Sequence, residues 1–87
     1  MRLMYKVIWE SSAEKGLTKI DKKLARKIKN KVETYLAQDP INRGEPLDYE
    51  YKGYYRYRFS DYRVIYQVKE TELLVIVVKV GHRKEIY

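Results

Sequence analysis

The chain has 87 residues, of which 19 are Lys or Arg and 12 are Asp or Glu, giving a formal net charge of +7. A chain this short forms one domain, spanning residues 1–87, and its basic excess favours polyanionic partners: nucleic acid first, an acidic protein second, an anionic membrane third. It has no cysteine, which excludes disulfides and thiolate metal sites. With only one histidine in the sequence, we expect no metal or cofactor.

The first residues predict a strand followed by a short helix. Residues 5–9 (YKVIW) are rich in β-branched and aromatic side chains, a composition typical of a strand. Ser11 and Glu14 have the spacing of a capping box, which predicts that a helix begins there and runs to about Ile20. Gly16 weakens this helix, since glycine in a helix costs about 1 kcal/mol relative to alanine.

A second, longer helix is predicted from its cap, Asp21, to about Gln38, because Pro40 prevents it from continuing. Apolar residues recur along it at the helical period and predict a core-facing side: Leu24, Ile28, Val32, Tyr35 and Leu36. Its other side is dense in bases, which suits the phosphate backbone of structured RNA or DNA, although such a run is commonly only a solvated face. These candidate RNA-binding residues are Lys22, Lys23, Arg26, Lys27, Lys29 and Lys31.

The remainder of the chain predicts a loop and three strands. The loop spans residues 40–53, with Leu47 as the side chain that anchors it to the core. The strands are residues 54–59, 62–69 and 73–80, and their short connections require antiparallel pairing. The last strand is apolar on both faces, so we expect it to lie centrally in the sheet, but it is far too short to span a bilayer.

The sequence therefore predicts a cytoplasmic protein without membrane contact. The expected fold is α+β with the order β-α-α-β-β-β, in which a helical hairpin packs on a small twisted antiparallel sheet.

The segment YYRYRFSDYR, residues 54–63, carries a cluster of arginines. Side chains alternate along a strand, so Arg56 and Arg58 share one face, and a turn at residues 60–61 returns Arg63 beside them. Three guanidiniums on one face repel each other, and arginine binds phosphate oxygens through paired hydrogen bonds, so a phosphate chain is the expected ligand. The alternative is a solvated face whose arginines pair with nearby acids, such as Asp48, Glu50 or Glu70.

The C-terminal sequence GHRKEIY adds further candidates. Gly81 is expected to end the last strand, so that Arg83 joins the other arginines. Tyr87 offers an aromatic ring on which a base can stack, unless it is only a frayed terminus. His82 is the only side chain that titrates near neutrality and so the only ordinary acid–base catalyst, although a lone histidine is commonly a surface residue.

The order of these elements, with YYRYRFSDYRVIYQV and VVKVGHRKEIY, resembles the RelE/ParE toxin superfamily of prokaryotic toxin–antitoxin systems over nearly the whole chain. The RelE branch is similar to a metal-independent endoribonuclease that cuts messenger RNA in the ribosomal decoding site and so inhibits translation. The resemblance implies site positions at Arg56, Arg58, Arg63, Arg83 and Tyr87. Some members carry lysines where this chain has Arg56 and Arg58, which leaves the general base unassigned.

The mechanism implied by the resemblance is attack of the ribose 2′-OH on the adjacent phosphate, which leaves a cyclic phosphate. Preorganised arginines would stabilise the charged transition state, Tyr87 would stack on the nucleotide, and the basic helix would grip ribosomal RNA. Arginine is a poor base because it scarcely deprotonates. We hypothesise that either His82 or a group of the ribosome protonates the leaving oxygen.

The resemblance also implies a RelB-like antitoxin whose acidic segment covers the basic groove. Apolar residues around Trp9, Leu17 and Ile20 are candidate contact points, although core packing is the favoured interpretation of each. DNA would be bound only through the toxin–antitoxin complex. Two alternatives remain open: a ParE-like toxin that inhibits DNA gyrase without chemistry, and a non-catalytic nucleic-acid-binding module. The clustered arginines and the terminal tyrosine favour the ribonuclease.

Overall fold

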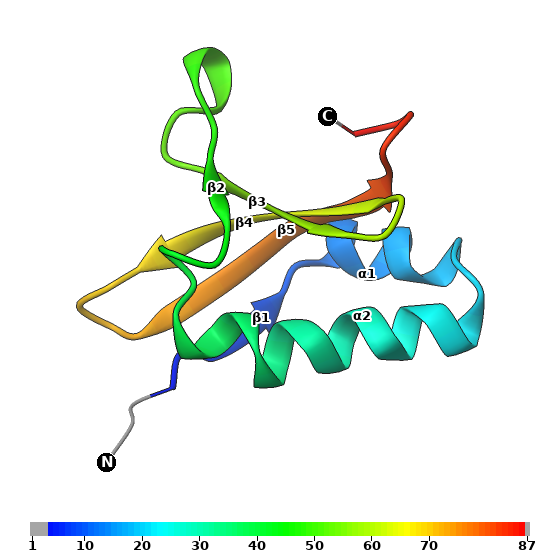
Figure 1. The fold of residues 1–87 in the computed structure, drawn as a ribbon, viewed down its shortest axis with the longest axis horizontal. Helices are drawn as coiled ribbons and strands as arrows, with labels where there is room; N and C mark the ends of the chain where they lie inside the picture. The colour runs from blue at the N-terminus through cyan, green and yellow to red at the C-terminus, as the bar shows by residue number, and fades with distance from the viewer. Residues whose placement is uncertain (1–3, 87) are drawn as a thin grey trace.

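The computed structural model describes residues 4–86, in which two helices pack against one face of a five-stranded sheet with the strand order β1-β5-β4-β3-β2 (Figure 1). The strands are β1 (Lys6–Trp9), β2 (Glu45–Pro46), β3 (Tyr55–Phe59), β4 (Tyr62–Lys69) and β5 (Leu74–His82). The helices are α1 (Ser11–Thr18) and α2 (Lys22–Thr34), with single 3-10 turns η1 (Leu36–Gln38) and η2 (Tyr49–Tyr51). The predicted α+β class and the order of the main elements are confirmed.

The sheet is mixed, and this is where it departs from the predicted antiparallel arrangement. β3–β4 and β4–β5 pair antiparallel, as their short connections require. β1, however, runs parallel to β5, with Lys6 opposite Leu74 and Trp9 opposite Val77. No short connection joins these two strands, so the loop-length argument set no direction for β1. β5 lies between β1 and β4, which agrees with its apolar character on both faces.

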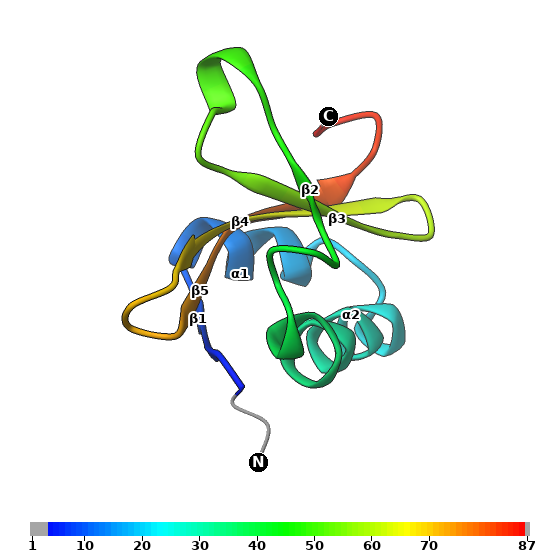
Figure 2. The same cartoon turned by 60° about the vertical axis from the view of Figure 1, so that its left-hand side comes forward.

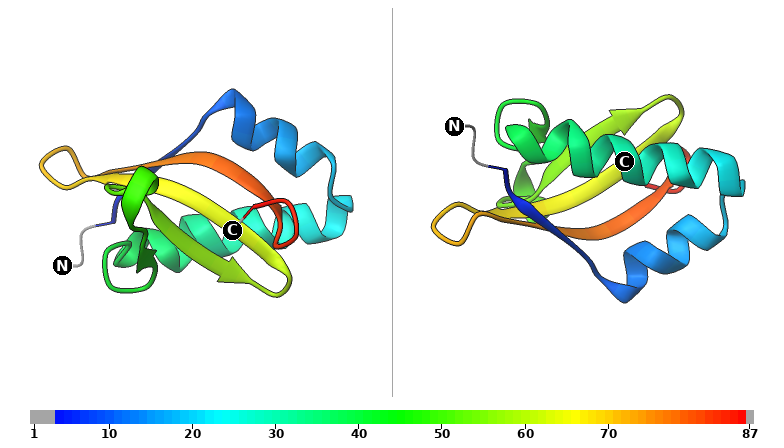
Figure 3. Two further views of the ribbon diagram at one scale, coloured as in Figure 1. Left: turned by 90° about the horizontal axis from the view of Figure 1, so that it is seen from above. Right: turned by 90° about the horizontal axis from the view of Figure 1, so that it is seen from below.

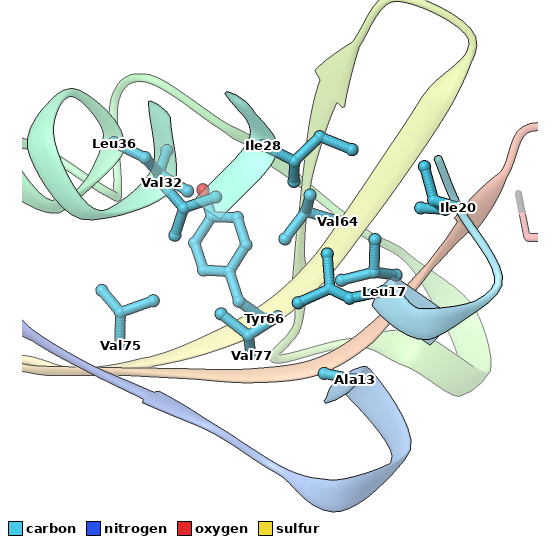
Figure 4. Close-up of a cluster of buried hydrophobic side chains, with 11 residues drawn as sticks. Ala13, Leu17, Ile20, Ile28, Val32, Leu36, Val64, Tyr66, Val75 and Val77 are labelled. Atoms are coloured by element: carbon cyan, nitrogen blue, oxygen red, sulfur yellow. The ribbon is translucent and has the colours of Figure 1, made fainter. Parts of the chain in front are cut away.

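One hydrophobic core fills the space between the helices and the sheet (Figure 4). Its fully buried members include Ile28 and Val32 from α2, Val64 from β4 and Val77 from β5. The predicted apolar side of the second helix is therefore the core side. Its exception is Tyr35, which is 38% exposed.

The two predicted helix caps had different outcomes. The Asp21 carboxylate accepts hydrogen bonds from the amides of Lys23 (3.2 Å) and Leu24 (3.3 Å), as expected for an N-cap. The capping box predicted at Ser11 is wrong, because Ser11 already lies inside α1 and the N-cap, Glu10, makes no side-chain cap bond.

Gly16 allows α1 to lie directly on β5. A Cβ at this position would overlap the carbonyl oxygen of Val80, an atom of the β5 backbone that has no room to move. From the sequence alone, Gly16 is only a weak point in the helix. In the structure it permits close packing of the helix on the sheet.

Tyr66 ties the segment between α2 and β3 to the core. Its buried hydroxyl donates a hydrogen bond to the carbonyl of Pro40 (2.7 Å), and burial raises the pKa of this phenol above its usual value. Gly44 packs against the same hydroxyl, which a Cβ would overlap. Leu47, the predicted anchor, is not part of the core; it lines a cavity on the other face of the sheet.

The face of the sheet opposite the helices will be called the open face. α2 passes behind the strands in the view from above and in front of them in the view from below (Figure 3). The η2 loop and the C-terminal segment both rise on the open side (Figures 1 and 2). Any site on this face is therefore bordered by these two segments.

Gly16→Ala should destabilise the protein by about 1–3 kcal/mol in urea unfolding, because the added methyl group is forced into the β5 backbone. Lys15→Ala, an exposed change on the same helix, is the matched control and should have little effect. Stabilisation by about 1 kcal/mol, the usual result for glycine replaced in a solvated helix, would contradict the close approach.

Candidate anion-binding site

The register of β3 and β4 places three arginines on the open face. Arg58 lies directly opposite Arg63, and Arg56 lies opposite Ile65. The intervening pair, Tyr57 and Val64, points to the core. Strand alternation therefore directs the guanidiniums away from the helices, as the turn at residues 60–61 predicts.

Arg63 is the centre of this cluster. Burial lowers the pKa of its guanidinium from the usual value, and neighbouring positive charges lower it further. In decreasing order of effect, those charges belong to Arg58, Arg56 and Arg83, while Asp61 acts in the opposite direction. The structure thus brings the other three predicted arginines within electrostatic range of Arg63. We call these four residues the arginine cluster.

The side chain of Arg63 is held in place by backbone oxygens. Its Nη1 donates to the carbonyl of Tyr62 (3.2 Å) and, more weakly, to that of Ser60 (3.5 Å), both at the β3–β4 turn. Arg56, by contrast, has an Nε donor that is buried and lacks a hydrogen-bond partner within residues 4–86. A buried donor of this kind is stabilised when a ligand oxygen reaches it.

Two carboxylates partly neutralise the arginine cluster. Glu45 on β2 lies 3.1 Å from Arg58 Nε and 3.4 Å from Arg56 Nη2. Asp61 Oδ1 lies 3.8 Å from Arg83 Nε. Four guanidiniums against two carboxylates leave a net charge of +2, so the cluster keeps a positive excess for an anion.

Glu45 is a site residue that the sequence analysis missed. The acids considered there as partners for the arginines were Asp48, Glu50 and Glu70. Glu45 reaches the cluster because residues 45–46 form an edge strand paired with β3, which puts Glu45 opposite Arg56. Lys79 was also missed; it lies opposite Ile65 on the open face, one strand further along.

The structure does not bring His82 into the arginine cluster. His82 pairs with Tyr62, and the two rings meet edge to face at 5.4 Å. Since Tyr62 packs against the core, this histidine faces the helix side of the sheet. Its Nδ1 accepts a hydrogen bond from the amide of Lys84 (3.1 Å), so the neutral ring carries its proton on Nε2. Tyr87, the last predicted member, lies outside the described residues.

The bases of α2 form a second basic surface, on the other side of the sheet from the arginine cluster (Figure 1). Five of the six are exposed: Lys22, Lys23, Arg26, Lys27 and Lys31. Lys29 is half-buried, with its Nζ 5.5 Å from the centroid of the Trp9 ring. One phosphate group cannot contact both surfaces, so the two sets of predicted residues do not form a single site.

Two kinds of feature are absent from residues 4–86. Within this range no cluster of three or more histidine or acidic side chains is arranged to hold a metal ion. None of the helices in the same range is long and apolar enough to cross a membrane.

Glu45→Gln should increase the affinity of the purified protein for inorganic pyrophosphate by about twofold to fivefold, because it removes the carboxylate that competes for Arg56 and Arg58. Isothermal titration calorimetry measures this directly. Glu72→Gln, in the exposed β4–β5 turn, is the matched control and should leave the affinity unchanged. Weaker pyrophosphate binding by Glu45→Gln would show that anions bind elsewhere.

Comparison with known proteins places this geometry in a family. Residues 7–87 match the family model described as the ParE toxin of the type II toxin–antitoxin system parDE. The chain is 26% identical over 83 residues to Toxin RelG of Mycobacterium tuberculosis, covering 95% of each chain.

Solved structures share the fold. The toxin–antitoxin complex RelBE2 from Mycobacterium tuberculosis aligns with a TM-score of 0.89 at 24% identity, covering 95% of both chains. The isolated RelE toxin of E. coli aligns with a TM-score of 0.70 at 24% identity, covering 90% of this chain and 83% of that one. Because its family model spans most of the sequence, the chain belongs to the ParE toxin family, within the RelE/ParE superfamily of type II toxin–antitoxin toxins.

Proposed function

We propose that this toxin is a ribosome-dependent endoribonuclease that cuts messenger RNA in the decoding site and so arrests translation. The observation that carries the proposal is the arginine cluster, in which Arg58 lies directly opposite Arg63 on the open face and shares the Glu45 carboxylate with Arg56. Like charges held this close are unfavourable unless an anion joins them. A phosphodiester at its transition state, with negative charge on its equatorial oxygens, suits such a cluster.

In the proposed reaction the ribose 2′-oxygen forms a bond to the adjacent phosphorus, and the bond from phosphorus to the 5′-oxygen breaks. The products are a 2′,3′-cyclic phosphate and a 5′-hydroxyl. The arginine cluster stabilises the charge that develops, with Arg56 and Arg63 as its most enclosed members. No covalent bond to the protein forms, so the site contributes position and electrostatic stabilisation.

The proton transfers need a group other than arginine, which does not deprotonate in proteins. Glu45 is a carboxylate already in contact with two members of the cluster, and we assign it the role of accepting the 2′-OH proton. His82 is the weaker candidate for protonating the 5′-oxygen, because its ring packs on Tyr62 at the other face. Solvent supplies that proton if His82 does not.

The residue that precedes Tyr87 lies near the arginine cluster. Ile86, the preceding residue, is buried and packs on Gly81, which lies opposite Arg63 in the sheet. The role of Tyr87 itself, stacking on a base to orient the 2′-OH, stays a prediction, since this residue is outside the described range.

The basic surface of α2 is proposed to hold ribosomal RNA while the arginine cluster on the opposite face acts on the message. Such backbone contacts provide affinity without sequence reading. The relative from Mycobacterium tuberculosis was solved as a toxin–antitoxin complex, and we propose an acidic, RelB-like antitoxin for this chain too, with DNA bound only through that complex. Leu17 and Ile20 are buried in the core, which is the favoured interpretation of their sequence, so the half-buried Trp9 is the more accessible of the candidate contacts.

Arg63→Gln should lower cleavage of ribosome-bound message by about 10²–10³-fold, the usual loss when one transition-state donor is removed. Its melting temperature should not fall, because the substitution relieves repulsion within the cluster. The readout is mapping of cut ends on translated messages. Lys69→Gln, an exposed change at the end of β4, is the control with parental cleavage.

The competing function is a ParE-like toxin that inhibits DNA gyrase, which the description of the matching family favours. Purified protein that causes gyrase-mediated DNA breakage, and leaves messages on ribosomes uncut, would establish it in place of the ribonuclease. A protein with neither activity would be the non-catalytic nucleic-acid-binding module.

The catalytic roles of Glu45 and His82 can be distinguished by comparing one conservative variant of each residue. Glu45→Gln should bind pyrophosphate more tightly and yet cut ribosome-bound message at least about 10²-fold more slowly, because the proton acceptor is lost. His82→Gln should cut at close to the parental rate. The reverse result, with His82→Gln inactive and Glu45→Gln active, would remove Glu45 from the proton transfers and make His82 the essential group.

A further inference from the structure

A cavity of about 350 Å³ lies on the open face beside the arginine cluster. It is enclosed between the η2 loop and the C-terminal turn, the two segments that rise on this side of the sheet (Figure 2). Its apolar and aromatic walls come from Leu47, Tyr51, Tyr54, Ile65 and Ile86. The proposed function so far gives this cavity no role.

The cavity is continuous with the arginine cluster along the sheet. Ile65, in its floor, is paired with Arg56, and Lys79 is paired with Ile65 on the next strand. Tyr54 precedes Arg56 by two residues, a step of about 7 Å along an extended chain. A nucleotide whose phosphate rests on Arg56 can therefore place its own base in the cavity.

Three charged side chains border the cavity and have no ion pair or hydrogen bond within residues 4–86. They are Lys79 from the sheet, Glu50 from η2 and Glu85 from the C-terminal turn. An ammonium group offers hydrogen-bond donors, whereas a carboxylate only accepts. The cavity thus combines flat apolar walls with one donor and two acceptors, which are the features needed to hold a polar aromatic ring by its edge.

Guanine matches this arrangement among the RNA bases. Its O6 and N7 are acceptors suited to a lysine, and its N1–H and exocyclic amine are donors suited to a carboxylate. Adenine has an exocyclic donor where guanine has O6, so it would direct a donor at Lys79. Cytosine and uracil have smaller rings and cover less of the apolar wall.

We propose that this cavity is a guanine-selective subsite for the RNA strand, with Lys79 contacting O6 and N7, and Glu50 and Glu85 accepting from the opposite edge of the base. The proposal rests on the proposed ribonuclease function and adds a base preference to it. Tyr51 and Tyr54 supply the aromatic surface against which the base packs.

The test compares the four nucleoside 3′-monophosphates by NMR titration of the ¹⁵N-labelled protein. Guanosine 3′-monophosphate should bind roughly tenfold more tightly than the cytidine or adenosine analogue, and should shift the amides of Tyr51, Tyr54 and Ile65. Inorganic phosphate, which has no base, should shift only the arginine cluster. Equal affinity for all four nucleotides, or shifts limited to the arginines, would overturn the subsite.

A doubly substituted variant, Glu50→Ala with Glu85→Ala, removes both acceptors and should bind the four nucleotides within about twofold of one another while keeping parental affinity for inorganic phosphate. Glu72→Ala is the matched control and should keep the guanine preference. Retention of the preference by the double variant would contradict the assigned contacts.

Parallel cleavage assays on ribosomes separate this inference from the proposed function. Wild-type protein that cuts messages but binds all four nucleotides equally would overturn only the subsite. Wild-type protein that prefers guanosine 3′-monophosphate but cuts no message would overturn the ribonuclease and leave a guanine-binding cavity on the toxin.

Discussion

Repulsion between guanidiniums that a sheet holds in fixed register is the constraint on which the rest of this structure depends. Arg58 and Arg63 are directly opposed across β3 and β4, an arrangement of like charges that destabilises a strand pair. The next pair along the strands, Tyr57 with Val64, packs toward the core on the other face. Burial on the helix side thus holds together two strands whose charges repel on the open side. Within residues 4–86, only the carboxylate of Glu45 bridges two of these charges. Unfavourable contacts of this kind, which the packing of the rest of the fold outweighs, are typical of functional sites.

In the proposed function, the two basic surfaces bind different RNAs. α2 presents exposed bases on one side of the molecule, while the arginine cluster lies across the sheet on the other. A protein built this way is suited to sit between a large structured RNA and a separate strand. In the proposal, the partly enclosed Arg56 and Arg63 fix the position of the bound phosphate. The α2 bases attract RNA through less specific electrostatic contacts, which salt screens. In the proposal, the cavity beside the arginine cluster extends that surface with a place for a base.

Local sequence signals predicted much of the fold and part of the site. Strand alternation around Arg56 and Arg58, the tight turn before Arg63, the cap at Asp21 and the apolar side of α2 all depend on neighbours within a few residues, and the structure reproduces them. Contacts between segments that lie far apart in the sequence could not be predicted from such local signals. β1 pairs with β5 across most of the chain, and Glu45 reaches the arginines only because a two-residue edge strand forms. The face taken by His82 depends on its register with Tyr62, including an irregularity between Ile65 and Tyr66 that no local pattern signals.

The most direct test of the account is to follow the arginine Nε–H signals by NMR while adding a short RNA with 2′-O-methyl riboses, which can bind but cannot be cut. The account predicts that Arg56, Arg58, Arg63 and Arg83 shift together and saturate at one RNA per protein. The largest change is expected at Arg56, whose buried Nε would gain its missing acceptor. Shifts confined to the bases of α2, with the four arginine signals unmoved, would contradict it.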